Sequence, residues 1–345
     1  MDRFALQSAR SVTEAASLAK LTVAGAMLDD SVATDRVVLK AGGIDLLDLM
    51  KEGLLRPTRL INLRDIPGLD GITQSDAGTR IGALTTLEQL AAHPAVRQRY
   101  TAVADAALSS GSPQIRHLAT LGGNLLQRPR CWYFRSMAHH CARKGGDHCF
   151  AFSGENQYHA VFGHNGCAIV HPSTVATALV ALNARVELVD AQQRTRVVPL
   201  ASFLTGPEID ITTETDLRAG EVLTAVLLPA MPGSARSVFL KQAERLSSDW
   251  SIADVAIVLD RDADGRCQSA SVVLGAAAPV PWRAQSAEAA LTGRVIDEAV
   301  ARAAGDAAIA GAEPLSHNAY KLPILATLVR RAVLRASGIA NQETK

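Results

Sequence analysis

The sequence predicts a mixed helix-and-strand protein of two or three domains, and three observations indicate this. Its 345 residues are 48% hydrophobic, which is enough for a large buried core and long for one domain. In residues 1–60 short apolar runs alternate with segments of helical periodicity, as is typical of α/β structure. From about residue 236 several strand-like segments precede two helical ones, which indicates a separate C-terminal unit.

The first 60 residues carry a helix start signal, a strand and a helix stop signal. Ser11 and Glu14 form a capping-box pattern, and Gly53 stands where a helix would end. The elements expected here are, in order, a helix over 15–27, a strand over 37–40, a helix over 44–53 and a strand over 60–63.

The middle of the chain continues with both element types. Thr85 and Glu88 form a second capping-box pattern. The elements expected are a strand over 79–84, helices over 85–93, 101–109 and 174–183, and strands over 184–190, 195–200 and 220–229. The C-terminal unit is expected to hold strands over 238–245, 254–260 and 269–277 and helices near 285–311 and 318–337, the last ending at Gly338.

Residues 127–166 differ in composition from the rest of the chain. They hold five of the nine histidines, several glycines and few aliphatic residues. Irregular segments of this length are rarely left unsupported in a compact domain. We therefore expect a long insertion that something other than hydrophobic burial organises.

Two glycine pairs, Gly42-Gly43 and Gly122-Gly123, each suggest a site for an anion. Glycine lets successive backbone N–H groups converge on a phosphate, and a helix N-terminus after it adds favourable partial charge. A Gly-Gly pair before a helix is also an ordinary tight turn. Neither pair belongs to a GxGxxG fingerprint, so a nicotinamide Rossmann site is not indicated.

Charge and hydropathy exclude several classes of partner. The net charge of +1 gives no field that would attract nucleic acid or a membrane surface. No run approaches the roughly 20 apolar residues of a membrane-spanning helix. The first 20 residues lack the apolar segment of a secretory signal, so export by a signal of this chain's own is not expected.

Four of the five cysteines, Cys131, Cys141, Cys149 and Cys167, fall in or beside the insertion. Four thiolates can hold a 4Fe–4S cluster, whereas zinc modules usually carry closely spaced pairs, which are missing here. The nearby histidines keep zinc open, and a stretch without metal is a third interpretation. Cys267 stands alone and is expected to be a structural thiol.

Six motifs, in order along the chain, resemble one known family. They are KAGGIDLLDLM at 40–50, QIRHLATLGGNLLQ at 114–127, HPSTVATAL at 171–179, GEVLTAVLLP at 220–229, FLKQAER at 239–245 and GAAAPVPWRA at 275–284. The family is that of the FAD-binding medium subunits of xanthine dehydrogenases and related molybdenum hydroxylases. The resemblance implies an α+β fold: a PCMH-type FAD domain of two α/β subdomains, at 1–60 and 61–235, and a C-terminal α+β flavoprotein domain at 236–345.

The resemblance also implies which residues hold FAD. The stretch around the first glycine pair would wrap the pyrophosphate, a second segment would complete that site, and a leucine and a lysine would lie near the flavin ring. These cofactor residues are Val38, Leu39, Lys40, Ala41, Gly42, Gly43, Ile44, Asp45, Leu46, Thr120, Gly123, Asn124, Thr174, Leu223 and Lys241. Two positions depart from the family: Thr174 replaces the usual aspartate at the ribityl chain, and Ile44 replaces a common threonine.

The insertion is similar to that of the aldehyde oxidoreductase branch, in which four cysteines of this loop bind a 4Fe–4S cluster. Cys131, Cys141, Cys149 and Cys167 are therefore the expected ligands, in an insertion at about 127–167. The resemblance implies an electron-transfer subunit that works with a molybdenum-cofactor large subunit, a 2Fe–2S small subunit and an external electron acceptor. A cytoplasmic location is expected, or a periplasmic one through export with a signal-bearing partner.

Two other functions remain open at this point. An autonomous flavin reductase or oxidase of the MurB type would need its own acid or base, and no residue is a convincing candidate. His139, His140 and His171 are expected to be structural, so no catalytic residue is predicted. The second alternative is a non-catalytic assembly module whose cysteine-rich loop binds zinc.

Overall fold

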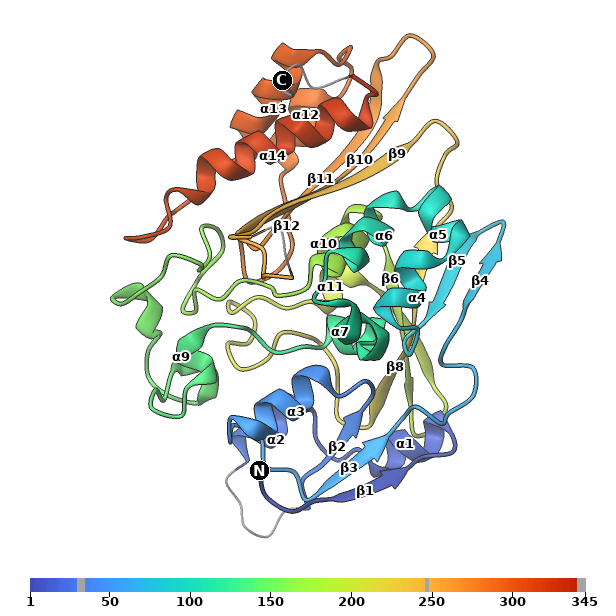
Figure 1. Ribbon diagram of the computed structural model, residues 1–345, viewed down its shortest axis with the longest axis vertical. Helices are drawn as coiled ribbons and strands as arrows, with labels where there is room; N and C mark the ends of the chain where they lie inside the picture. Colours follow the sequence, from blue (N-terminus) through green and yellow to red (C-terminus); the bar gives the residue numbers. More distant parts are fainter. Residues whose placement is uncertain (30–34, 246–247, 340–345) are drawn as a thin grey trace.

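A computed structural model describes residues 1–29, 35–245 and 248–339. Three sheets follow one another along the long axis of the molecule (Figure 1). The insertion lies to one side, at the left of the N-terminal and middle parts in this view. The α+β fold that the resemblance implied is confirmed, with strands and helices throughout. Within the described ranges, no helix is both long and apolar enough to cross a bilayer.

The N-terminal sheet is parallel, with the order β1-β3-β2. Its strands are β1 (Ala5–Ser8), β2 (Val37–Lys40) and β3 (Arg59–Asn62), and its helices are α1 (Val12–Leu18), α2 (Val23–Leu28) and α3 (Ile44–Lys51). Ser11 accepts the backbone N–H of Glu14 at 3.1 Å, which confirms the predicted helix start. The single helix expected over 15–27 is wrong, because Thr22 caps a second helix through the N–H of Gly25.

The middle sheet has five antiparallel strands in the order β4-β5-β8-β6-β7. They are β4 (Ile72–Ser75), β5 (Gly78–Gly82), β6 (Arg185–Asp190), β7 (Thr195–Pro199) and β8 (Glu221–Pro229). The helices of this part are α4 (Leu87–Ala92), α5 (Pro94–Arg99), α6 (Thr101–Leu108), α7 (Pro113–Leu118), α8 (Leu121–Leu125), α10 (Thr174–Ala181) and α11 (Leu200–Phe203). The capping box predicted at Thr85 is wrong by one residue, since Thr86 and Gln89 form it.

The insertion contains little regular structure but does have a small core. It holds α9 (Trp132–Arg135) and two short 3-10 turns, η1 (Ala142–Lys144) and η2 (Phe150–Phe152). Phe134 and Cys141 are buried in one cluster with Leu49 and Met50 of α3. The expectation that hydrophobic burial does not organise this segment is therefore wrong where it packs against α3.

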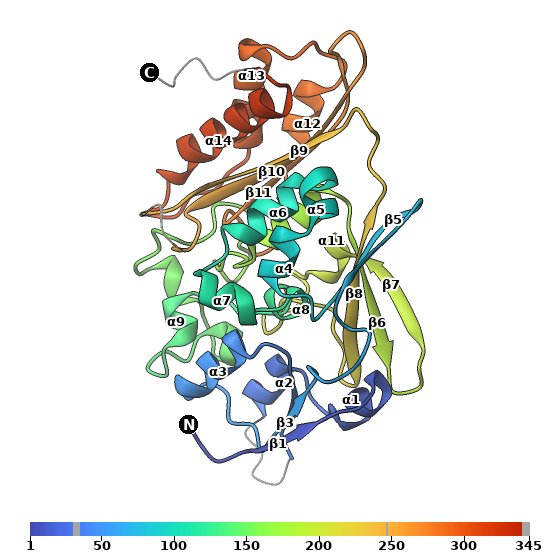
Figure 2. The ribbon, with the colours of Figure 1, turned by 45° about the vertical axis from the view of Figure 1, so that its right-hand side comes forward.

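The C-terminal unit is an antiparallel sheet with helices on one face, as Figure 2 shows from a second side. Its strands are β9 (Arg236–Gln242), β10 (Ala253–Arg261), β11 (Cys267–Gly275) and β12 (Trp282–Arg283), and its helices are α12 (Gln285–Leu291), α13 (Glu298–Ala308) and α14 (Lys321–Ala336). Val255 and Ile257 pack toward these helices, whereas Ala256 joins the core of the middle part. Because side chains alternate along a strand, Asp254 is placed on the face toward the middle part, next to Lys241 across the ladder.

Candidate functional site

A cavity of about 520 Å³ lies between the loop that joins β2 to α3, helices α7 and α8, strand β8 and strand β9. Most of the residues predicted to bind a cofactor line it. These lining residues are Leu39, Ala41, Gly42, Gly43, Ile44, Asp45, Leu46, Thr120, Gly123, Asn124, Thr174, Leu223 and Lys241. Val38 is buried in the core against α3, and Lys40 turns its ammonium group to the carbonyl of Ala41, so neither lines the cavity.

The first glycine pair is required by its backbone geometry. Gly43 has a φ of 84° and begins α3 without a side-chain cap. A Cβ added to Gly42 would fall 2.1 Å from the carbonyl oxygen of Leu118, at the end of α7. This close approach brings the β2–α3 loop against the segment that leads into α8. The N-terminus of α3, which has no side-chain cap, therefore lies where these two chain segments meet. A free helix N-terminus at such a place favours the binding of an anion such as a pyrophosphate.

The second glycine pair lies inside α8 and not in a free loop. Gly122 packs so closely that an added Cβ would be 3.0 Å from Leu223 and from Ala83. The N–H of Gly123 is donated to the hydroxyl of Thr120 at 3.2 Å, which caps the helix. Close packing thus accounts for Gly122, and the helix cap uses the N–H of Gly123 and a lone pair of the Thr120 hydroxyl, two of the three groups predicted to complete the pyrophosphate site.

The departure at Thr174 changes the polar lining at the start of α10. The hydroxyl of Thr174 donates to the carbonyl of Ala106 at 3.2 Å and lies 2.7 Å from the hydroxyl of Ser110. Ser173 donates its hydroxyl to Oδ1 of Asn124 at 2.5 Å. The lining here is neutral and hydrogen-bonded, where an aspartate would have supplied a charge.

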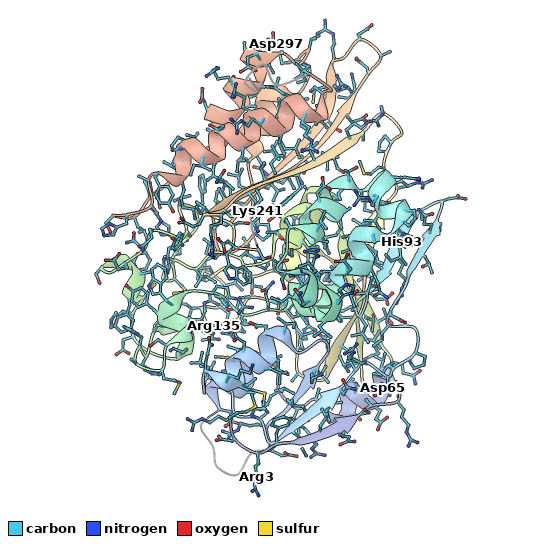
Figure 3. All side chains as sticks on the ribbon, in the orientation of Figure 1. Arg3, Asp65, His93, Arg135, Lys241 and Asp297 are labelled. Atoms are coloured by element: carbon cyan, nitrogen blue, oxygen red, sulfur yellow. The ribbon has the colours of Figure 1, made fainter. Side chains whose placement is uncertain are left out.

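Lys241 reaches the cavity from β9 and is fixed by backbone groups. Its ammonium donates to the carbonyls of Asp249, at 2.6 Å, and Ser109, at 3.0 Å. Burial lowers the pKa of Lys241, while the nearby charges of Asp254 and Asp249 oppose that shift. Figure 3 shows Lys241 at the junction of the C-terminal sheet and the middle part, and Arg135 at the end of α9 on the side toward α3. Lys241 therefore supplies a cation that is held in place where β9 lines the cavity.

Asp45, in the first turn of α3, forms a hydrogen bond and ion pairs with arginines of the insertion. It accepts the backbone N–H of Arg128 at 2.8 Å and forms ion pairs with Arg130, at 2.8 Å, and Arg135, at 2.6 Å. These partners were not predicted, although the sequence QRPRCWYF at 127–134 offered the arginines as a signal. The negative charge also sits at the positive end of the helix dipole, so the arrangement stabilises α3 and fixes the start of the insertion.

A buried carboxylate, Glu214, joins two of the insertion's arginines. Arg128 lies 3.1 Å from one oxygen of Glu214, and Arg143 lies 2.6 Å from the other. Arg143 is 1% exposed, and its Nε also donates to Sγ of Cys167 at 3.4 Å. A fully buried charge persists only when it is paired in this way.

Electrostatic contacts link several of the predicted thiols of the insertion. Cys149 and Cys167 interact directly: the thiol of Cys149 donates to Cys167, which lowers the pKa of Cys167 and raises that of Cys149, and Arg143 adds to the lowering at Cys167. Burial raises the pKa of Cys131 to about 11, and the charges of Cys167 and Cys141 act in the same direction. Cys267 is buried separately, in the C-terminal core.

The thiols do not form a closed metal site. Across residues 1–29, 35–245 and 248–339, no three or more His, Cys, Asp or Glu side chains are arranged to hold a metal ion. The histidines of the insertion have other contacts: His159 lies 3.2 Å from Cys131, His164 lies 2.8 Å from the carbonyl of Glu313, and His139 packs edge-on against Phe150.

Comparison with known proteins gives two family matches that cover most of the chain. The family described as the FAD binding domain in molybdopterin dehydrogenase matches residues 3–231, and the CO dehydrogenase flavoprotein C-terminal domain matches residues 238–336.

Curated and solved relatives agree with these matches. The chain is 39% identical over 285 residues to the aldehyde oxidoreductase FAD-binding subunit of Escherichia coli strain K12, covering 82% of this chain and 86% of that protein. It is 28% identical over 299 residues to the carbon monoxide dehydrogenase medium chain of Hydrogenophaga pseudoflava, covering 86% and 87%. A solved carbon monoxide dehydrogenase from that organism superposes with a TM-score of 0.72 over 98% of both chains, at 28% identity.

Proposed function

The chain belongs to the family of FAD-binding medium subunits of the molybdenum hydroxylases, and we propose that it carries electrons from the iron–sulfur and molybdenum subunits of such an enzyme, through FAD, to an external acceptor. The relatives are named dehydrogenases and oxidoreductases, so the chain is a flavoprotein subunit of an oxidoreductase. The lining of the first cavity is the observation that supports this proposal. The β2–α3 loop, α8, α10, β8 and β9, which hold most of the predicted FAD residues, together line it.

The lining residues fit the parts of FAD in chemical type. The uncapped start of α3 after Gly43 suits the pyrophosphate, and the hydroxyl of Thr174 with Asn124 suits the ribityl chain. Leu223 offers an apolar wall for the ring, and the Lys241 ammonium offers a cation beside it. FAD supplies one- and two-electron chemistry when bound, and a nearby cation favours the reduced, anionic form.

We propose further that Cys131, Cys141, Cys149 and Cys167 hold a 4Fe–4S cluster. Four cysteines of one segment are the ligand type that such a cluster needs, and Arg143 offsets negative charge at Cys167. The 39% identical relative is the FAD-binding subunit of an aldehyde oxidoreductase, which agrees with the branch that the insertion resembles. A bound cluster would join α9, η1 and η2 and stabilise the insertion beyond its small core.

The proposed partners are a molybdenum-cofactor large subunit and a 2Fe–2S small subunit, which would carry out substrate oxidation. His171 is buried with a pKa lowered to about 4 by desolvation, and His139 packs among aromatic rings, so both suit structural roles. We propose domains at residues 1–60, 61–235 and 236–345. We also propose that the protein acts in the cytoplasm, or in the periplasm after export together with a partner subunit.

The experiment is reduction of the flavin in two preparations. The chain is purified alone and in complex with its co-expressed partner subunits, and an aldehyde is added to each without oxygen. The proposal predicts that flavin absorbance bleaches in the complex and stays constant in the isolated chain. Substrate oxidation by the isolated chain would contradict it and would favour an autonomous flavin enzyme.

A further inference from the structure

A contact between Arg130 of the insertion and Trp250, just before β10, lies at the edge of the first cavity. The Cζ atom of Arg130 is 4.7 Å from the centroid of the Trp250 ring, which is a cation–π distance. Both residues line the first cavity. Trp250 is also 54% exposed and the Arg130 side chain 21% exposed. The pair therefore lies at the rim, where the cavity meets solvent.

The same pair stands where the first cavity adjoins a second one. The second cavity has a volume of about 650 Å³, lies between the insertion and the C-terminal sheet, and has Asp254 and His171 on its wall. The residues that line both cavities are Arg130, Pro172, Asp249, Trp250 and Ser251. Arg130 belongs to the insertion and Trp250 to the C-terminal part, so their contact connects two distant parts of the chain across this boundary.

The Arg130 side of the contact is fixed by carboxylates of α3. Its guanidinium forms ion pairs with Asp45 at 2.8 Å and with Asp48 at 3.1 Å. A guanidinium that is hydrogen-bonded to two carboxylates keeps its direction, because rotation would break both bonds. Arg130 is therefore the stationary partner.

The Trp250 side has a fixed backbone and a side chain that can turn. Asp249, before Trp250, accepts the Lys241 ammonium through its carbonyl at 2.6 Å. Ile252, after it, donates its N–H to the carbonyl of Gln242 at 2.9 Å. The backbone at Trp250 is thus held on β9 from both sides. Because the ring is half exposed, it can leave Arg130 by side-chain rotation alone.

The strength of the contact suits an element that opens and closes. One cation–π pair at an exposed site changes an equilibrium constant by about fivefold. The ring would therefore spend most of its time against Arg130 and still leave it often. A buried ion pair in the same place would hold the rim closed much more firmly.

The anchors of the two partners lie beside the groups proposed to hold opposite ends of FAD. Asp45 stands in the first turn of α3, just after Gly43, where the pyrophosphate is proposed. Asp249, next to Trp250, is bound by Lys241, which is proposed to lie beside the flavin ring. A closed contact between Arg130 and Trp250 would therefore cross the cavity between the two ends of the bound cofactor.

We propose that Arg130 and Trp250 form a clasp at the rim of the first cavity, which slows both the entry and the release of FAD. The clasp opens when the Trp250 ring turns away from the guanidinium. The proposal deepens the proposed function and rests on it, because the cavity must hold FAD for the clasp to act.

The test measures how fast FAD enters and leaves the full chain. Chain loaded with radiolabelled FAD is mixed with excess unlabelled FAD, and the label that stays bound is counted over time. Entry is measured by mixing FAD with chain from which the flavin has been removed. Because both partners of the contact belong to the protein, its loss is expected to speed entry and release alike and to leave Kd within about twofold.

Three variants and a control assign the effect to this contact. Trp250→Ala is expected to raise both rate constants about fivefold, whereas Trp250→Phe keeps an aromatic face and stays within about twofold of the parent. Arg130→Met should match Trp250→Ala, and the double variant should add no further increase, because the two changes remove the same contact. Tyr320→Ala, at an exposed aromatic beside the start of α14, is the control and leaves both rates unchanged.

The outcomes separate this inference from the function on which it rests. If Trp250→Ala releases FAD faster but takes it up at the parent rate, the clasp is overturned, because the ring then only contacts bound FAD. Unchanged rates in Trp250→Ala overturn it too, even if Arg130→Met does not fold, as do effects of the two residues that multiply in the double variant. A parent chain that binds no FAD contradicts the proposed function, whereas FAD binding with unchanged rates contradicts this inference alone.

Discussion

Nε of Arg143 donates to Sγ of Cys167 at 3.4 Å, while Nη1 of the same guanidinium donates to Oε1 of Glu214 at 2.6 Å. Glu214 continues the chain of contacts to Arg128 at 3.1 Å, and the backbone N–H of Arg128 donates to Asp45 at 2.8 Å. Asp45 stands in the first turn of α3, just after Gly43. The thiol segment and the proposed pyrophosphate loop are thus joined by buried, charge-assisted bonds.

Arg143→Met is expected to destabilise the protein, because it leaves Glu214 buried with one partner fewer. The expected loss is about 3 kcal/mol in the free energy of unfolding, measured by denaturant titration. The double variant Arg143→Met/Glu214→Leu removes both charges and should lose less than the sum of the two single changes. Arg194→Met, at an exposed ion pair with Asp190, is the control and should change stability little. Strict additivity of the double variant would count against a coupled buried pair.

Gly42→Ala is expected to separate the two chain segments that line the first cavity. The added Cβ would fall 2.1 Å from the carbonyl of Leu118, so the β2–α3 loop must shift. We expect a loss of about 3 kcal/mol in stability together with a lower FAD content per chain. Gly233→Ala has open space around its Cβ and serves as the control. Normal FAD content in the Gly42 variant would show that the loop does not need this close approach.

Most elements were predictable from the sequence because their signals are local. Periodicity predicted β2, α3, β8 and the C-terminal strands, and Ser11 gave the start of α1. The errors were also local in origin. Thr22 caps a second helix, which the apolar periodicity did not indicate, and Thr86 rather than Thr85 caps α4.

The ion-pair network and the second cavity were not predictable, for a different reason. Arg143 and Glu214 are 71 residues apart in the sequence. No sequence pattern around either residue indicates that the two side chains will meet. Asp254 and His171 likewise come from a strand and a loop that meet only after the C-terminal sheet packs on the middle part. The candidate thiols and glycines were found because their residue types are rare and chemically specific, whereas arginines and glutamates are common on every surface.

Lys241→Met is expected to lower the reduction potential of the bound flavin. The Lys241 ammonium is held at the cavity by the carbonyls of Ser109 and Asp249, and loss of its charge removes support for the reduced, anionic flavin. The measurement is a spectroscopic redox titration of the purified chain. Lys51→Met, at the exposed end of α3, controls for the change in net charge. Equal shifts in the two variants would mean that Lys241 acts only through the overall charge.

Asp254→Asn is expected to change how stability depends on pH. Burial raises the pKa of Asp254 from 3.8 to about 6, so between these values the folded protein binds more protons than the unfolded chain. The contribution of this group to stability is present at low pH and is lost as the pH rises through 6. The free energy of unfolding of the parent minus that of the variant should therefore fall by about 3 kcal/mol across this range. A difference that is independent of pH would show that Asp254 is not desolvated.

The central claim is that this chain holds FAD and, through four cysteines, a 4Fe–4S cluster. Its most direct test is the content of FAD, iron and sulfide per chain after purification without oxygen, in the parent, in Cys149→Ser and in Cys267→Ser. The account predicts about one FAD and about four iron per chain in the parent, the same values in Cys267→Ser, and loss of iron with FAD retained in Cys149→Ser. A parent with FAD but no iron, or a Cys149→Ser variant with unchanged iron, would contradict the cluster assignment and would leave all iron–sulfur centres in the partner subunits or on other ligands.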